Sequence, residues 1–150
     1  MILVTNIAIS SSHSLIAFSV NSKFFVNGTC YYLILKDKSD IRYYSILGLL
    51  NSKVIEYFHK TTIGNSLYAK RFRYWTSYIS VYPVAKRLFD STRLVTQLVM
   101  NVSRLLNNPN VKECIDIENE NDNLCYQLFD FTKSEIQEIE TILSVHRSQS

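Results

Sequence analysis

The residues best suited to hold a charged partner lie in one run, SLYAKRFRYWTSYISVYPV, which spans residues 66 to 84. Here Lys70, Arg71 and Arg73 stand among aromatic side chains, and the run contains no histidine, cysteine or carboxylate. Arginine pairs with a guanine edge through two parallel hydrogen bonds, and an aromatic ring stacks on a base or supports the arginine. Nucleic-acid recognition needs these groups and needs no nucleophile, so the run favours binding over catalysis.

Residues that carry catalysis or hold a metal are not grouped in this sequence. The three histidines and the three cysteines show no metal-ligand spacing, and no serine stands in a glycine-flanked nucleophile turn. Neither G-x-G-x-x-G nor G-x-x-x-x-G-K is present, and the chain has only 3 glycines. We therefore expect no enzyme activity, metal or cofactor in this chain.

The charges are separated along the 150 residues, although the net charge is only +3. Between residues 51 and 87, seven cationic side chains accompany one carboxylate, whereas nine carboxylates accompany one lysine between residues 113 and 140. A basic middle suits a polyanion and an acidic end would be held away from it, although ordinary solvated faces explain the same segregation. The sequence has no run of eighteen apolar residues and a poor signal peptide, so we expect a cytoplasmic protein without a membrane partner.

The elements that would position the basic run are expected to form one α+β domain. The first third of the chain alternates in short branched and aromatic stretches, which predict a small antiparallel sheet with a hairpin at Asn27-Gly28. A further strand is expected near 78–82, ended by Pro83. Apolar periodicity predicts a central helix at about 40–60 and C-terminal helices at about 86–106, 121–129 and 133–145. The last helix begins at a capping box, Thr132 to Glu135.

The order of these segments resembles a known family. NGTCYYLILKD, then LGLLNSKVIEYFHK, then the basic aromatic run, and finally LCYQLFDFTKSEIQEIE follow one another as in the TaqI-like C-terminal specificity domain. That family comprises the target-recognition domains of adenine-specific DNA methyltransferases and of type IIG restriction-modification enzymes. The resemblance implies that residues 1–150 are a single specificity domain, the C-terminal part of a larger or split enzyme.

The resemblance also implies a function for particular residues. The family's variable basic segment maps onto residues 66 to 75, so the expected DNA-facing set contains Lys70, Arg71, Arg73 and Tyr74, with Tyr68 and Trp75 as second candidates. Lys53 and Lys60 are expected to touch phosphate from the central helix. The partners implied are double-stranded DNA and a methyltransferase catalytic domain or subunit, which would bind S-adenosylmethionine and flip out the adenine. No Asn-Pro-Pro-Tyr motif is present to do this chemistry here.

The sequence also fits a protein of another functional class. A protein-interaction domain would use the same aromatic segment and the acidic tail to dock a partner subunit. Such a domain predicts association that does not depend on salt, whereas DNA binding weakens steeply as salt rises. A small enzyme of unknown type is a third and weaker hypothesis, because no constellation of residues supports it.

Overall fold

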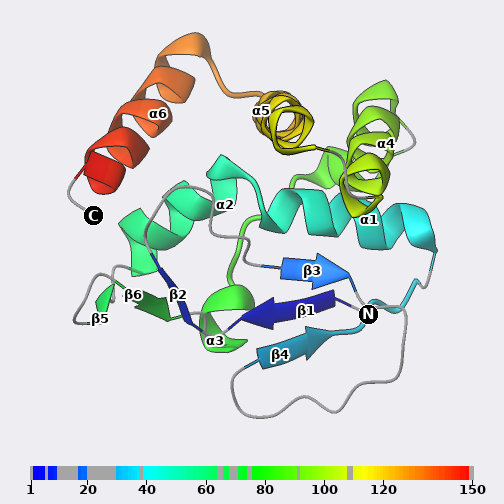
Figure 1. The fold of residues 1–150 in the computed structure, drawn as a ribbon, viewed down its shortest axis with the longest axis horizontal. Coiled ribbons are helices and arrows are strands. Elements are labelled where there is room, and N and C mark those ends of the chain that lie inside the picture. Colours follow the sequence, from blue (N-terminus) through cyan, green and yellow to red (C-terminus); the bar gives the residue numbers. More distant parts are fainter. Residues whose placement is uncertain are drawn as a thin grey trace.

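The computed structural model describes residues 2–5, 7–9, 17–19, 30–37, 39–63, 66–67, 71–73, 76–90, 92–107 and 110–148. Within these ranges, six short strands precede or interrupt a series of helices (Figure 1). The strands are β1 (Ile2–Thr5), β2 (Ile7–Ile9), β3 (Ala17–Ser19), β4 (Cys30–Leu33), β5 (Ser66–Leu67) and β6 (Arg71–Arg73). The helices are α1 (Asp40–Leu50), α2 (Lys53–Phe58), the π-helical turn η1 (His59–Ile63), α3 (Thr76–Ile79), the 3-10 turn η2 (Lys86–Phe89), α4 (Arg93–Leu106), α5 (Val111–Leu128) and α6 (Lys133–Ser148).

The described strands form two separate antiparallel sheets of three strands each. One sheet has the order β3-β1-β4, and the other has the order β2-β6-β5. In the first sheet Leu3 lies opposite Phe18 on one side and Tyr32 on the other. The chain passes from one sheet to the other between β1 and β2, so these consecutive strands do not pair with each other. Apolar residues fill most of these strand positions, and they include isoleucine, valine, phenylalanine and tyrosine, which favour strands.

Helices carry most of the buried apolar side chains for which the structure describes burial. Among the fully buried side chains are Leu49, Ile55, Leu98, Tyr126 and Leu143, all of which lie on helices. The described strands are two to four residues long, shorter than the usual strand of a sheet that supports a domain. The predicted α+β class, with one antiparallel sheet as the platform for the helices, is therefore wrong. α4, α5 and α6 lie on the side of α1 and α2 that faces away from the first sheet (Figure 1).

The predicted central helix at 40–60 is broken after Leu50. Asn51 and Ser52 leave the helical conformation, and the Ser52 hydroxyl donates to the carbonyl oxygen of Leu49 at 2.7 Å. A second helix, α2, then starts at Lys53 and passes into the π-helical turn η1. The serine competes locally for the backbone acceptor, which is a common reason for a helix to stop.

The predicted strand near 78–82 is also wrong. Residues 76–79 form the short helix α3, and a turn follows at Ser80 and Val81. Tyr82 is buried, and its hydroxyl and the Nδ1 atom of His59 share a hydrogen bond of 2.8 Å. Its ring also meets Phe58 edge to face. These contacts with α2 and η1 hold the segment in a path that β propensity does not predict.

The C-terminal helices agree with the sequence in part. The predicted helix at 86–106 is divided into η2 and α4, because Thr92 caps α4 by accepting from the backbone N–H of Val95 at 3.3 Å. The helix expected at 121–129 begins earlier, where the Asn110 side chain caps α5. The capping box of α6 is confirmed: Thr132 N–H donates to the Glu135 carboxylate at 2.7 Å, and Glu135 N–H donates to the Thr132 hydroxyl at 3.4 Å.

The hairpin expected at Asn27-Gly28 lies outside the described residues. None of the helices in the described ranges is both long and apolar enough to cross a bilayer.

Candidate nucleic-acid interface

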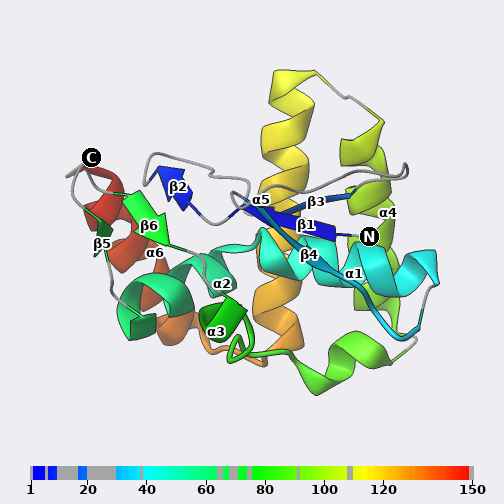
Figure 2. The same cartoon turned by 90° about the horizontal axis from the view of Figure 1, so that it is seen from below.

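Arg71 and Arg73 lie on β6, the central strand of the second sheet. Arg71 pairs with Ile9 of β2 and with Leu67 of β5, and Arg73 pairs with Ile7. Alternate residues of a strand belong to the same face of its sheet, so the register places the two arginines on one face and Phe72 on the other. The second sheet lies at one end of the long axis of the molecule, with α4 at the other end (Figures 1 and 2).

The other predicted loop residues lie outside the described residues. These are Lys70, Tyr68, Tyr74 and Trp75, which flank β6 in the sequence. Of the expected DNA-facing set, the structure therefore brings together Arg71 and Arg73, whose backbone it places. Contact of any of these six residues with DNA stays a prediction.

Lys53 lies at the start of α2, where two carboxylates hold it. Its ammonium donates to both oxygens of Glu140 on α6, at 2.9 and 3.0 Å, and lies 3.7 Å from the nearer oxygen of Asp122 on α5. Only 15% of the Lys53 side chain is exposed. A phosphate would have to compete with these two carboxylates for the same ammonium group. Phosphate contact by Lys53 stays a prediction, and this geometry weighs against it.

Lys60 is the other cation expected to reach phosphate, and its side chain is 3% exposed. It lies in η1 and pairs with Glu56, one helical turn earlier, at 2.5 Å. Burial removes its ammonium from the surface at which DNA would arrive. For Lys60 too, phosphate contact stays a prediction that the burial and the ion pair oppose.

Three side chains around Lys53 form a polar cluster that the sequence does not indicate: Asp122, Tyr126 and Glu140. Asp122 accepts from the backbone N–H of Lys53 at 2.8 Å, and the Tyr126 hydroxyl donates to Glu140 at 3.0 Å. Burial raises the pKa of Asp122 to about 6, although its contacts with Lys53 pull it down. Burial, followed by the charge of Glu140, raises the pKa of Tyr126. The spacing of Asp122 and Tyr126 on one helical face was the available signal, but it has no specific meaning without the partner helix.

A second buried polar contact lies just before the basic run. His59 is 1% exposed, and besides its bond to the Tyr82 hydroxyl it meets the edges of the Tyr78 and Tyr82 rings. His59 starts the π-helical turn, a rare form that is often found near functional sites. The contact ties η1 to the segment after α3, and so fixes both ends of the stretch that contains β5 and β6.

Residues 2–84 match the TaqI-like C-terminal specificity domain. The chain belongs to this family. It is also 34% identical over 101 residues to the type II methyltransferase M.BanIII of Aneurinibacillus aneurinilyticus, a match that takes in 66% of this chain and 17% of that protein. The chain thus spans well under two thirds of the relative's length. The family expected from the order of the sequence segments is confirmed.

The residues that match the specificity domain include Lys53 but not the three side chains of the polar cluster around it. They contain all of the described strands, α1, α2, η1 and α3, and therefore Arg71, Arg73 and Lys53. Helices α4, α5 and α6 lie outside the match, together with Asp122 and Glu140. Lys53 is thus a residue through which the family's segment is bonded to α5 and α6.

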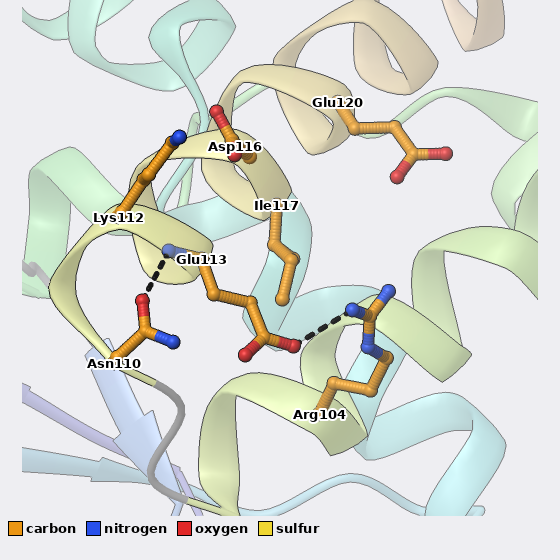
Figure 3. A pocket seen from close by; sticks show the side chains of 7 residues that line it. All are labelled: Arg104, Asn110, Lys112, Glu113, Asp116, Ile117 and Glu120. Carbon is orange, nitrogen blue, oxygen red and sulfur yellow. Dashed lines mark hydrogen bonds and ion pairs between the residues drawn. The ribbon is translucent and has the colours of Figure 1, made fainter.

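A surface hollow of about 290 Å³ lies between the end of α4 and the start of α5, also outside the specificity-domain match (Figure 3). Arg104 pairs with Glu113 across it at 2.8 Å, and Asn110 caps α5 at its rim. Its remaining lining residues are Lys112, Asp116, Ile117 and Glu120. Within the described ranges, no group of three or more histidine, cysteine, aspartate and glutamate side chains is arranged to hold a metal ion. The hollow is a solvated, mixed-charge surface and offers no catalytic arrangement.

Proposed function

We propose that this chain recognises a sequence in duplex DNA, as the specificity domain of a restriction-modification adenine methyltransferase. The observation that carries the proposal is the family match over residues 2–84, which contains the strand with Arg71 and Arg73. Two arginines on one face of a short antiparallel sheet suit the major groove, which admits a β-ribbon and presents guanine O6 and N7 to a guanidinium.

Chemistry on the bound DNA belongs to another domain or subunit in this proposal. A type II methyltransferase is among the proteins similar to this chain, and the match takes in 17% of that protein. A catalytic partner would bind S-adenosylmethionine and flip the adenine, and the present chain would select the site. We propose no cofactor for the chain itself.

The proposal is tested by selection from a pool of random duplexes with the full 150-residue chain. The chain is incubated with the pool at about 50 and about 200 mM salt, because phosphate contacts make binding depend steeply on salt over this range. The expected result is enrichment of one short sequence. Retention of the pool without enrichment, or no retention at either salt concentration, would contradict it.

Two variants connect the selection to β6. The double variant Arg71→Ala/Arg73→Ala should lose the enrichment. Arg93→Ala is the matched control, because Arg93 is an exposed arginine at the start of α4, at the far end of the molecule from β6 (Figure 2). Thermal melting of each variant checks that the fold is retained. Binding that is the same in both variants would show that β6 is not the reading element.

A further inference from the structure

The start of α2 is bonded to two helices that lie far away in the sequence. The side chain of Ser52, the residue before α2, makes no capping bond to this helix. Instead, Asp122 of α5 accepts from the Lys53 N–H at 2.8 Å, which supplies the acceptor that a helix start needs. The Lys53 ammonium, at the same helix start, pairs with Glu140 of α6 at 2.9 Å. One residue therefore joins α2 to both C-terminal helices.

The surrounding groups make this junction specific. Glu140 is held by the Tyr126 hydroxyl as well as by Lys53. The Lys53 and Asp122 side chains are 15% and 11% exposed, so the two charges are largely withdrawn from water. Buried ion pairs add little net stability, but removal of one partner is strongly destabilising because it leaves the other charge buried without compensation. The arrangement is suited to selecting one way of docking the helices.

We propose that Lys53 is a positioning residue, which docks α5 and α6 on the start of α2 and so sets the place of β6, and that it does not contact phosphate. The first part stands on the contacts themselves. The second part rests on the proposed DNA-recognition function, since α2 leads through η1 to the strands β5 and β6.

The charged and titratable groups that face Asp122 come from each helix around it. They are Lys53 and Glu56 on α2, Glu140 on α6, and Cys125 and Tyr126 on α5. Lys53 is the cation in this set, so its removal leaves buried carboxylate charge without compensation. Burial raises the pKa of Asp122 to about 6 even beside Lys53, and loss of the lysine charge should raise it further, so protonation of the carboxyl should relieve that charge at mildly acidic pH.

The first experiment measures thermal melting of Lys53→Met at pH 7.5 and at pH 5.5. At the higher pH the melting temperature should fall by about 10 °C, the shift expected for an uncompensated buried charge in a chain of this size. At pH 5.5, or in the double variant Lys53→Met/Asp122→Asn, most of the loss should be recovered. The asparagine side chain in the double variant keeps an oxygen that accepts from the backbone N–H and carries no charge. If the Lys53→Met variant has the melting temperature of the wild type at both pH values, Lys53 does not dock the helices.

The second experiment measures DNA binding of the double variant, whose net charge equals that of the wild type. For a positioning residue, the affinity for the selected duplex should fall about two- to thirtyfold, while the dependence of log K on log salt stays the same. A residue that contacts phosphate would instead reduce that slope by about 0.9. A reduced slope, or unchanged affinity, overturns the positioning role. If the wild-type chain binds no DNA, the DNA-recognition function and the role of Lys53 in it both fail, whereas the docking role is still decided by the melting series.

Discussion

Gly48 of α1 lies so close to Leu98 of α4 that a Cβ atom on Gly48 would be 2.8 Å from the Leu98 Cδ1 atom. The same Cβ would be 3.0 Å from Cγ2 of Val102. Leu98 and Val102 are both buried, so a shift of either side chain would have to be taken up by the packed residues around it. The absence of a side chain at Gly48 thus allows α4 to pack closely against α1. Helix α1 lies within the residues that match the family, whereas α4 lies outside them.

Gly48→Ala should therefore destabilise the protein. Overpacking of a filled core costs about 1 to 3 kcal/mol, which outweighs the gain of up to about 1 kcal/mol that alanine brings to a helix interior. The midpoint of urea denaturation measures the change. The double variant Gly48→Ala/Leu98→Ala should lose less than the sum of the two single changes, because the leucine methyl that crowds the new Cβ is gone. A rise in the midpoint for Gly48→Ala alone would mean that the helices are not in close contact there.

Tyr82→Phe should lower the free energy of unfolding by roughly 1 to 2 kcal/mol. The change removes the hydroxyl that shares a buried hydrogen bond with His59 Nδ1. Tyr57→Phe, at a half-buried tyrosine of α2, is the matched control and should stay within about 0.5 kcal/mol. Urea denaturation at pH 7.5 compares the two. Equal effects would show that the bond to His59 contributes no stability of its own.

Asp122 should make the protein less stable as the pH rises from about 4 to about 6. Its pKa is raised in the folded state from 3.8 to about 6, so the folded protein holds the proton more tightly than the unfolded chain. The bound proton makes its full contribution to the free energy of unfolding below about pH 4, and this contribution is lost as the pH rises past 6. Its upper limit is roughly 3 kcal/mol. The difference in unfolding free energy between the wild type and Asp122→Asn, measured from pH 4 to 7.5, isolates this effect. A difference that does not change with pH would contradict it.

Arg71→Ala and Arg73→Ala should each reduce the preference for the selected duplex over a scrambled one. The loss should be roughly 1 to 3 kcal/mol if the guanidinium pairs with a guanine edge, with little change in the salt dependence. Fluorescence anisotropy with both duplexes measures the ratio of affinities, and Arg93→Ala again serves as the control. Equal weakening for both duplexes, with a salt slope reduced by about 0.9, would assign the arginine to phosphate instead.

Local signals in the sequence predicted the parts of the fold that depend on neighbouring residues. The capping box from Thr132 to Glu135 is such a signal, and α6 begins at Lys133 as it requires. Tyr82 shows the opposite case. Its β propensity and the following Pro83 predict a strand, but the partner that decides its conformation is His59, which lies 23 positions earlier.

The candidate site shows the same division. The residues of the basic run and the order of the segments around it are properties of the sequence, and they were enough to indicate the family that residues 2–84 match. The resemblance to the family also led us to expect a phosphate contact from Lys53 on the predicted central helix. Its partners Asp122 and Glu140 lie 69 and 87 residues later in the sequence, so no local sequence pattern could predict these contacts.

The sequence alone determined the family, the separation of charge and the helix starts that depend on adjacent side chains. The tertiary structure alone decided that helices carry most of the described core and that α4 packs closely against α1 at Gly48. It also decided that the carboxylates of α5 and α6 are the partners of Lys53. The physical reason is that capping and periodicity act within one or two turns of the chain, whereas burial and ion pairing depend on which distant segments come together.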